Sequence, residues 1–209
     1  MVTAGTSMYG FTELGGLVAG DSVVVIGPGA IGLLGVAVAK TLGAKPVILT
    51  GTRDNRLEIG TRLGTDHVIN VRNEDAVAKI KEHTDDIGAD FVPECSGASN
   101  ALNEAGQMVN RGGKICLAAF PHEDVRVDVM HLVANNIYVF GIRGEGKSGT
   151  HRATALMEQK RFDATLIHTH TSDMSDLPEA IRYAKDRVED AIKVVVTNKF
   201  AYAKDIAAE

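Results

Sequence analysis

A glycine-rich turn between a buried strand and a helix is the feature that most constrains how this chain can fold. Residues 23–26 are β-branched, as in a buried parallel strand, and Gly-Pro-Gly-Ala-Ile-Gly at 27–32 follows and opens a helix. Gly27 permits the tight turn, Gly29 lets a pyrophosphate approach the backbone, and Gly32 lets the helix pack closely on the sheet. With the N–H groups at the helix start, these residues predict a dinucleotide-binding turn. A purely structural glycine turn is the alternative.

Alternating strand and helix patterns continue beyond this turn. We expect strands at residues 23–26, 46–50, 66–70, 89–95, 114–119 and 137–142, and helices at 33–42, 53–63, 74–83, 100–109 and 127–134. Six strands alternating with helices predict an α/β fold, a doubly wound parallel sheet of the Rossmann type, with its ligand at the carboxyl ends of the strands.

The two ends of the chain follow other patterns. A helix is expected at residues 9–17, and after the glycine-rich stretch 144–149 a helix, strand, helix and strand at 150–160, 166–169, 177–187 and 192–197. These last elements form a C-terminal helix and strand extension to a completed sheet. We therefore predict a helical lead-in at 1–20, a dinucleotide-binding domain at 21–144 and a C-terminal segment at 145–209.

Composition limits the classes of partner. The net charge of −5 argues against nucleic acid and anionic membranes as standing partners, and no apolar run reaches the ~20 residues of a membrane span. The N-terminus lacks the basic and apolar regions of a secretion signal. Cys95 and Cys116 lie in apolar runs, and their spacing matches no zinc motif. Buried thiols and a cytoplasmic location are therefore expected.

Residues after the second strand bear on which dinucleotide is preferred. A carboxylate there would accept hydrogen bonds from the ribose hydroxyls and select NAD. Gly51 removes that carboxylate, Thr52 and Arg53 can donate to a 2′-phosphate, and Arg56 follows one turn later. We expect NADP, with NAD as the alternative because Asp54 is close by. Arg53 as an ordinary solvated residue at a helix start is the other interpretation.

Further motifs are spread over residues 6–199. They are GDSV at 20–23, RLE at 56–58, LG at 63–64, GAD at 88–90, ECSG at 94–97, RGGK at 111–114, TH at 169–170 and KVVV at 193–196. With the glycine turn, they resemble the coenzyme-binding half of medium-chain, zinc-type alcohol and polyol dehydrogenases, with threonine and sorbitol dehydrogenases the most similar in style. The resemblance implies an oxidoreductase in which zinc polarises the substrate oxygen and hydride passes between a hydroxyl-bearing carbon and nicotinamide C4.

The resemblance also implies roles for residues along the chain. Ile31 would pack behind the nicotinamide, Ser96 would lie near the ribose on the ring side, and Ser7 would contact the nicotinamide side. Lys193 would reach the pyrophosphate, with a surface lysine as the alternative. Three residues at strand ends would line the ring or its carboxamide through backbone groups: Leu117, Ala119 and Phe140. The expected dinucleotide contacts are Gly27, Gly29, Ala30, Ile31, Gly32, Gly51, Thr52, Arg53, Arg56, Ser96, Leu117, Ala119, Phe140 and Lys193.

The domain that carries the catalytic zinc ligands in this family has no counterpart in the sequence. The position of the last zinc ligand in many relatives falls at or just before the start of the sequence, where Thr3 is the nearest candidate and a poor ligand. His168 and His170 share an expected strand face without a third ligand. We therefore expect no catalytic or metal-binding residue here, zinc only in a full-length relative, dinucleotide binding without turnover by the chain alone, and a C-terminal segment that packs on the missing domain.

Two classes of function stay open. The chain is either the NADP-binding part of a dehydrogenase or a non-catalytic NADPH-binding or oligomer-forming module. A zinc-independent, quinone-reductase-like relative is a further possibility. The apolar strand at 137–142 would be an open sheet edge, so a homodimer or a higher homo-oligomer is expected.

Overall fold

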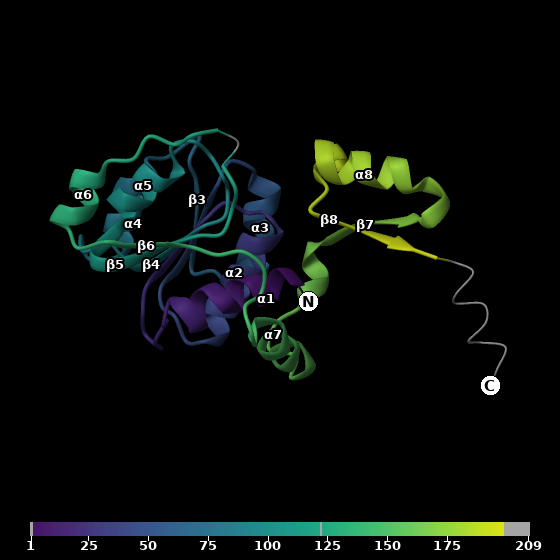
Figure 1. Cartoon of the computed structure of the whole chain (residues 1–209), viewed down its shortest axis with the longest axis horizontal. Helices are drawn as coiled ribbons and strands as arrows, with labels where there is room; N and C mark the ends of the chain where they lie inside the picture. The colour runs from purple at the N-terminus through teal and green to yellow at the C-terminus, as the bar shows by residue number, and fades with distance from the viewer. Residues whose placement is uncertain (1, 122, 199–209) are drawn as a thin grey trace. The chain divides into compact units, whose positions relative to one another are not determined.

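The computed structural model describes residues 2–121 and 123–198, which form two compact units, Met1–Asp163 and Ala164–Glu209 (Figure 1). Residues 199–209, the end of the predicted C-terminal segment, lie outside the described residues. Within the described ranges, no helix combines the length and the apolar character that a membrane span requires.

Six parallel strands form the sheet of the first unit, in the spatial order β3-β2-β1-β4-β5-β6. They are β1 (Val23–Ile26), β2 (Val47–Gly51), β3 (His67–Asn70), β4 (Ala89–Glu94), β5 (Val109–Leu117) and β6 (Tyr138–Gly141). The strand order reverses between β1 and β4, the position at which sheets of this kind bind ligands, at the carboxyl ends of the strands. The predicted doubly wound parallel sheet is confirmed.

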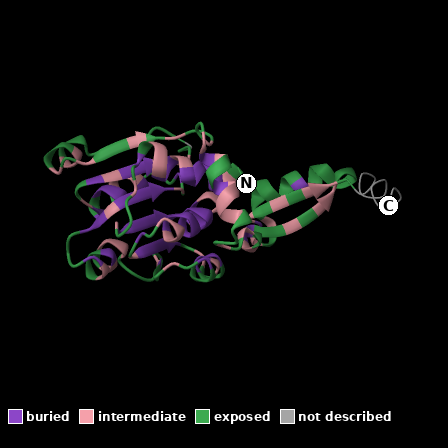
Figure 2. Cartoon of the chain, turned by 90° about the horizontal axis from the view of Figure 1, so that it is seen from below, coloured by how far each residue is buried: buried purple, intermediate pink, exposed green. Residues whose placement is uncertain are grey.

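Helices cover both faces of this sheet. They are α2 (Ala30–Thr41), α3 (Asp54–Arg62), α4 (Ala76–His83), α5 (Ala101–Met108) and α6 (Val129–Ala134). On one face, Val24 of β1 clusters with Ile80 of α4 and Met108 of α5. The neighbouring residue Val25 points to the other face, where a Cβ at Gly32 of α2 would lie 3.3 Å from it. Figure 2 shows the buried residues gathered on the strands between these layers.

The N-terminal helix begins earlier than expected. α1 (Val2–Met8) continues into a π-helical turn at Tyr9–Leu14, whereas the sequence pattern predicted a helix at 9–17. Gly5 and the β-branched residues Val2, Thr3 and Thr6 are weak helix formers, but α1 forms because it packs its buried residues against α2 and α7 (Gly149–Glu158). Tertiary packing has therefore overridden weak local propensity.

β5 also differs from its expected bounds. It begins at Val109, which the pattern gave to the preceding helix, and runs through the glycine pair that was expected to be a turn. Gly112 has a φ of +82°, and the register with β4 shifts between Ala89 and Phe91. The glycines therefore form an irregularity within a strand, a common role for glycine in sheets.

Up to residue 198, the last described, the second unit holds a two-stranded parallel sheet and one α-helix. Its elements are β7 (His168–Asp173), α8 (Leu177–Asp186) and β8 (Lys193–Thr197), with short 3₁₀ turns at Ala164–Ile167, Met174–Asp176 and Val188–Asp190. The strand expected at 166–169 is shifted, since residues 164–167 form the first of these turns. A helix and strand extension is present as predicted.

Candidate functional site

Three glycines build the turn between β1 and α2, and their surroundings differ. Gly27 has a φ of +97°, and a Cβ there would lie 2.9 Å from the Cβ of Ser96. A Cβ at Gly32 would lie 2.0 Å from the carbonyl oxygen of Gly27. Around Gly29, by contrast, a Cβ would meet no atom within 4 Å. The fold therefore requires glycine at 27 and 32, whereas position 29 faces open space.

Gly51, at the end of β2, packs directly on this turn. A Cβ at position 51 would lie 2.6 Å from both Cγ and Cδ of Pro28, and 3.3 Å from Cδ2 of Leu57. The carboxyl ends of β1 and β2 therefore approach more closely than a side chain at 51 would allow. Glycine at this position has a packing function in addition to its predicted role toward a phosphate.

The polar residues after β2 lie at the start of α3. Thr52 is exposed, Arg53 is half-buried and precedes the first residue of the helix, and Arg56 is buried in the first turn. The carboxylate of Asp54 accepts a hydrogen bond of 2.6 Å from the amide of Asn70, at the end of β3. Thr52 and Arg53 are thus at the same sheet edge as the glycine turn, while Arg56 is enclosed by protein.

A buried carboxylate fixes the loop after β4. Oε1 of Glu94 accepts hydrogen bonds from the backbone N–H of Ser96 at 2.6 Å, from its hydroxyl at 2.5 Å and from the N–H of Gly97 at 2.9 Å. Glu94 is only 4% exposed, so these bonds to a charged acceptor are strong ones. They hold Ser96 against Gly27. Sequence reasoning did not assign Glu94 a role; an acidic residue ending an apolar strand was the available signal.

The loops after β4 and β5 are also in contact. A Cβ at Gly97 would lie 2.7 Å from the carbonyl oxygen of Phe120 and 3.5 Å from the Cβ of Ala119. Leu117 ends β5 just before this loop. The structure therefore brings the predicted residues at 27–32, 51–53, 96, 117 and 119 to one edge of the sheet.

Two predicted contacts have other surroundings. The ring of Phe140, in β6, packs edge-on against Phe91, with ring centroids 6.1 Å apart. Its side chain therefore supports the core, and the contact predicted for its backbone stays a prediction. Lys193 begins β8 in the second unit and is exposed, so its contact with a pyrophosphate stays a prediction.

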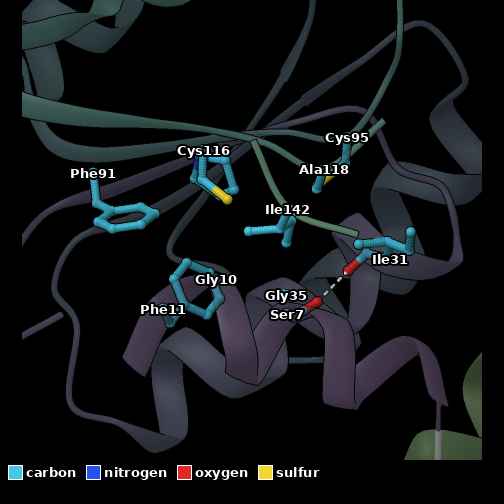
Figure 3. A pocket seen from close by; sticks show the side chains of 11 residues that line it. Ser7, Gly10, Phe11, Ile31, Gly35, Phe91, Cys95, Cys116, Ala118 and Ile142 are labelled. Atoms are coloured by element: carbon cyan, nitrogen blue, oxygen red, sulfur yellow. Dashed lines mark hydrogen bonds between the residues drawn. The ribbon is translucent and has the colours of Figure 1, made fainter. Parts of the chain in front are cut away.

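A small apolar cavity lies between the N-terminal helices and the carboxyl ends of β4, β5 and β6 (Figure 3). Ser7, Phe11 and Ile31 line it together with both cysteines. The hydroxyl of Ser7 donates a 3.0 Å hydrogen bond to the carbonyl oxygen of Ile31. Ser7, expected to contact the nicotinamide side, thus holds α1 on the first turn of α2.

Both thiols face this cavity and are held protonated. Cys116 is buried, as predicted; Cys95 is half-buried as a residue, but its thiol lines the cavity. Burial raises the pKa of the Cys95 thiol well above its ordinary value, and the nearby Cys116 and Glu94 raise it further. Burial, with the charge of Glu94, raises the pKa of Cys116 to about 12.

The described residues include no group of three or more His, Cys, Asp or Glu side chains placed to hold a metal ion. Thr3 lies in α1, half-buried. His168 and His170 were expected to share a strand face, but the register of β7 with β8 shifts between them. His168 lies 2.9 Å from the hydroxyl of Thr171, while the His170 ring packs on Tyr183 with centroids 5.1 Å apart.

Comparison with known protein families identifies the family of this chain. Residues 30–160 match the family model of zinc-binding dehydrogenases. The chain belongs to this family. The match begins at the first residue of α2 and ends just beyond α7, so it covers most of the first unit. The predicted resemblance to zinc-type alcohol and polyol dehydrogenases is confirmed.

Individual relatives agree with this assignment. The chain is 36% identical to L-threonine 3-dehydrogenase of Pyrococcus abyssi over 161 residues, 76% of this chain and 46% of that protein. It is 36% identical to sorbitol dehydrogenase of Bacillus subtilis over 124 residues, 59% of this chain and 35% of that protein. The matches cover 46% of the threonine dehydrogenase and 35% of the sorbitol dehydrogenase, so the chain spans about half the length of these relatives or less.

A solved structure shares the fold. The alcohol dehydrogenase of Thermotoga maritima superimposes with a TM-score of 0.88 at 29% identity, covering 95% of this chain and 56% of that one. The order of strands and helices described above is therefore that of a zinc-type alcohol dehydrogenase over the corresponding part.

The packing of Gly51 on Pro28 leads to a stability prediction. Gly51→Ala should lower the free energy of unfolding by about 1–3 kcal/mol, because the added methyl group overlaps the proline ring. Gly29→Ala is the matched control, since its methyl group meets no neighbour and its backbone is extended. Urea unfolding of both variants measures the difference. Equal stability of the two would show that Pro28 moves aside without cost.

The raised thiol pKa values predict slow chemistry in the folded state. At pH 8 neither Cys95 nor Cys116 should react measurably with Ellman's reagent, because the thiolate is the reactive form and burial suppresses it. Both should react at once in denaturant, giving two thiols per chain. Rapid reaction of the native protein would contradict the buried position of the thiols.

Proposed function

We propose that this chain is the dinucleotide-binding part of an alcohol or polyol dehydrogenase, and that it binds NADP in preference to NAD. The observation that carries the proposal is the open space at Gly29 within a turn whose other two glycines are tightly packed. The backbone of Gly29 has φ −84° and ψ −179°, which any residue adopts, so the fold itself does not require glycine there. Close approach of a ligand to the backbone would require it.

The pyrophosphate would lie at the start of α2. The first intrahelical bond of α2 runs from the N–H of Leu33 to the carbonyl oxygen of Gly29, so the N–H groups of Ala30, Ile31 and Gly32 precede the hydrogen-bonded ladder. With the helix dipole, such groups favour a phosphate. Gly27 and Gly32 would contribute by shaping the turn.

The two ends of the dinucleotide would lie on either side of that turn. Toward β2, Thr52 and Arg53 would bind the ribose 2′-phosphate, while Arg56 would support the start of α3. Toward β4 and β5, Ser96, Leu117 and Ala119 would lie along the nicotinamide half, with the backbone of Phe140 beyond them. The nicotinamide, when bound, supplies the hydride acceptor or donor; the residues of this chain bind and orient it.

We further propose that the chain alone does not oxidise alcohols. The described residues bring together no three metal-ligating side chains, and the chain spans only about half the length of its threonine dehydrogenase relative. The C-terminal segment would pack on a further domain, since Met174 and Ile181 expose apolar surface there. Turnover by the purified chain in the presence of a chelator would contradict this. A non-catalytic NADPH-binding module is the alternative.

Calorimetric titration with NADPH and NADH tests the proposed site. We expect tighter binding of NADPH. Gly29→Ala should weaken both dinucleotides about tenfold or more without loss of stability, because its methyl group occupies the space of the pyrophosphate. Arg53→Ala should weaken NADPH alone, by about tenfold, through loss of a charge-assisted bond. Binding of neither dinucleotide would contradict the site, and equal or tighter binding of NADH would favour NAD.

A homodimer is proposed through the free edge of β6. β6 ends the sheet, with Tyr138 and Val139 exposed. Val129, Met130 and Val133 of the preceding helix α6 are exposed as well. An apolar surface beside an unpaired strand favours pairing with a second copy about a two-fold axis.

Light scattering at micromolar concentration tests the dimer. The chain should have twice its monomer mass, and Tyr138→Glu should be monomeric because it places a charge on the exposed edge strand. Ile87→Glu, at a similarly exposed position in the loop before β4, is the matched control and should stay dimeric. A wild-type monomer would contradict the proposal.

A further inference from the structure

A hydrogen bond between two side chains joins the end of β3 to the first turn of α3. The Nδ2 group of Asn70 donates to Oδ1 of Asp54 at 2.6 Å. Oδ1 of Asn70 accepts from the N–H of Arg72 at 3.1 Å. Because its oxygen is engaged by a backbone donor, the amide presents its NH₂ group to the Asp54 carboxylate. The orientation of Asn70 is thus set from both sides.

The order of the strands shows to which side of β2 this hydrogen bond holds the Asp54 carboxylate. Asn70 pairs in register with Gly51, and the N–H of Val71 donates to the Gly51 carbonyl oxygen at 3.0 Å. Gly51 in turn packs on Pro28 of the glycine turn, on the β1 side of β2. β3 flanks β2 on the opposite side. Asn70 therefore draws the Asp54 carboxylate toward β3, on the side of β2 opposite the glycine turn.

We infer, on the basis of the dinucleotide site proposed above, that Asn70 is a positioning residue for phosphate selectivity. By holding Asp54 toward β3, it keeps a negative charge away from the position beside Arg53 where a ribose 2′-phosphate would bind. A carboxylate released from Asn70 can turn toward β1. There it repels the phosphate and accepts hydrogen bonds from an unmodified ribose, as the acidic residue of NAD-selective sites does.

The same geometry explains how an aspartate next to Arg53 is compatible with NADP. The carboxylate is exposed, so solvent and salt weaken its repulsion of a phosphate, but they do not abolish it within a Debye length of about 8–10 Å. The amide of Asn70 does not neutralise the Asp54 carboxylate and changes only the direction in which that carboxylate is held. Asn70 would therefore act through Asp54, without contacting the ligand.

Four variants test this by calorimetric titration of the full chain with NADPH and NADH. Asn70→Ala should raise the Kd for NADPH by about three- to tenfold and change that for NADH less than twofold, since only NADPH carries the phosphate. Asp54→Asn should bind NADPH at least as tightly as wild type. In the Asp54→Asn background, Asn70→Ala should have no further effect on NADPH. Asn73→Ala, in the same turn, is the control and should change neither ligand.

The outcomes separate this inference from the proposed function. Equal weakening of both dinucleotides by Asn70→Ala, no weakening at all, or a loss of NADPH affinity that persists in the Asp54→Asn background would overturn the role of Asn70. A wild-type chain that prefers NADH, yet loses NADPH selectively in Asn70→Ala, would overturn the NADP preference and leave the role of Asn70 standing. Binding of neither ligand by wild type would overturn both.

Discussion

Close backbone contact at the carboxyl ends of β1, β2 and β4 is the constraint on which the first unit depends. Pro28 lies on Gly51, Ser96 lies on Gly27, and the first turn of α2 lies on the carbonyl oxygen of Gly27, each at a distance that excludes a Cβ. These contacts fix where α2 begins and therefore where its N–H groups point. The position of these N–H groups is thus set by the packing of the chain on itself.

Local patterns were enough to predict this framework. The β-branched run before Gly27, and the alternation after it, depend on residues that neighbour one another in the sequence, so strands and helices could be placed within a few residues. Features that depend on distant partners were missed. α1 is helical from Val2 because small residues pack against α2 and α7, and Glu94 has its role because the loop after β4 folds back over its carboxylate.

Gly51 shows why a residue at the predicted site can still be ambiguous in function. Absence of a carboxylate at the end of β2 was interpreted from the sequence as a sign of NADP. The structure adds a second reason for glycine, the proximity of the Pro28 ring, which applies whichever dinucleotide is bound. The argument for NADP therefore depends on Thr52 and Arg53, and on where the charge of Asp54 points, more than on Gly51 itself.

Gly29 carries functional information because the fold gives no other reason for it. Glycine loses more backbone entropy on folding than other residues, so an alanine is favoured by about 0.4–1 kcal/mol where the backbone tolerates it. The backbone at 29 is extended and the space around it is open, so alanine would fit. Packing alone requires glycine at 27 and 32, so these two residues would be needed whether or not the turn binds a ligand. Glycine at 29 is instead accounted for by the pyrophosphate proposed at the start of α2, whose close approach to the backbone a Cβ would block.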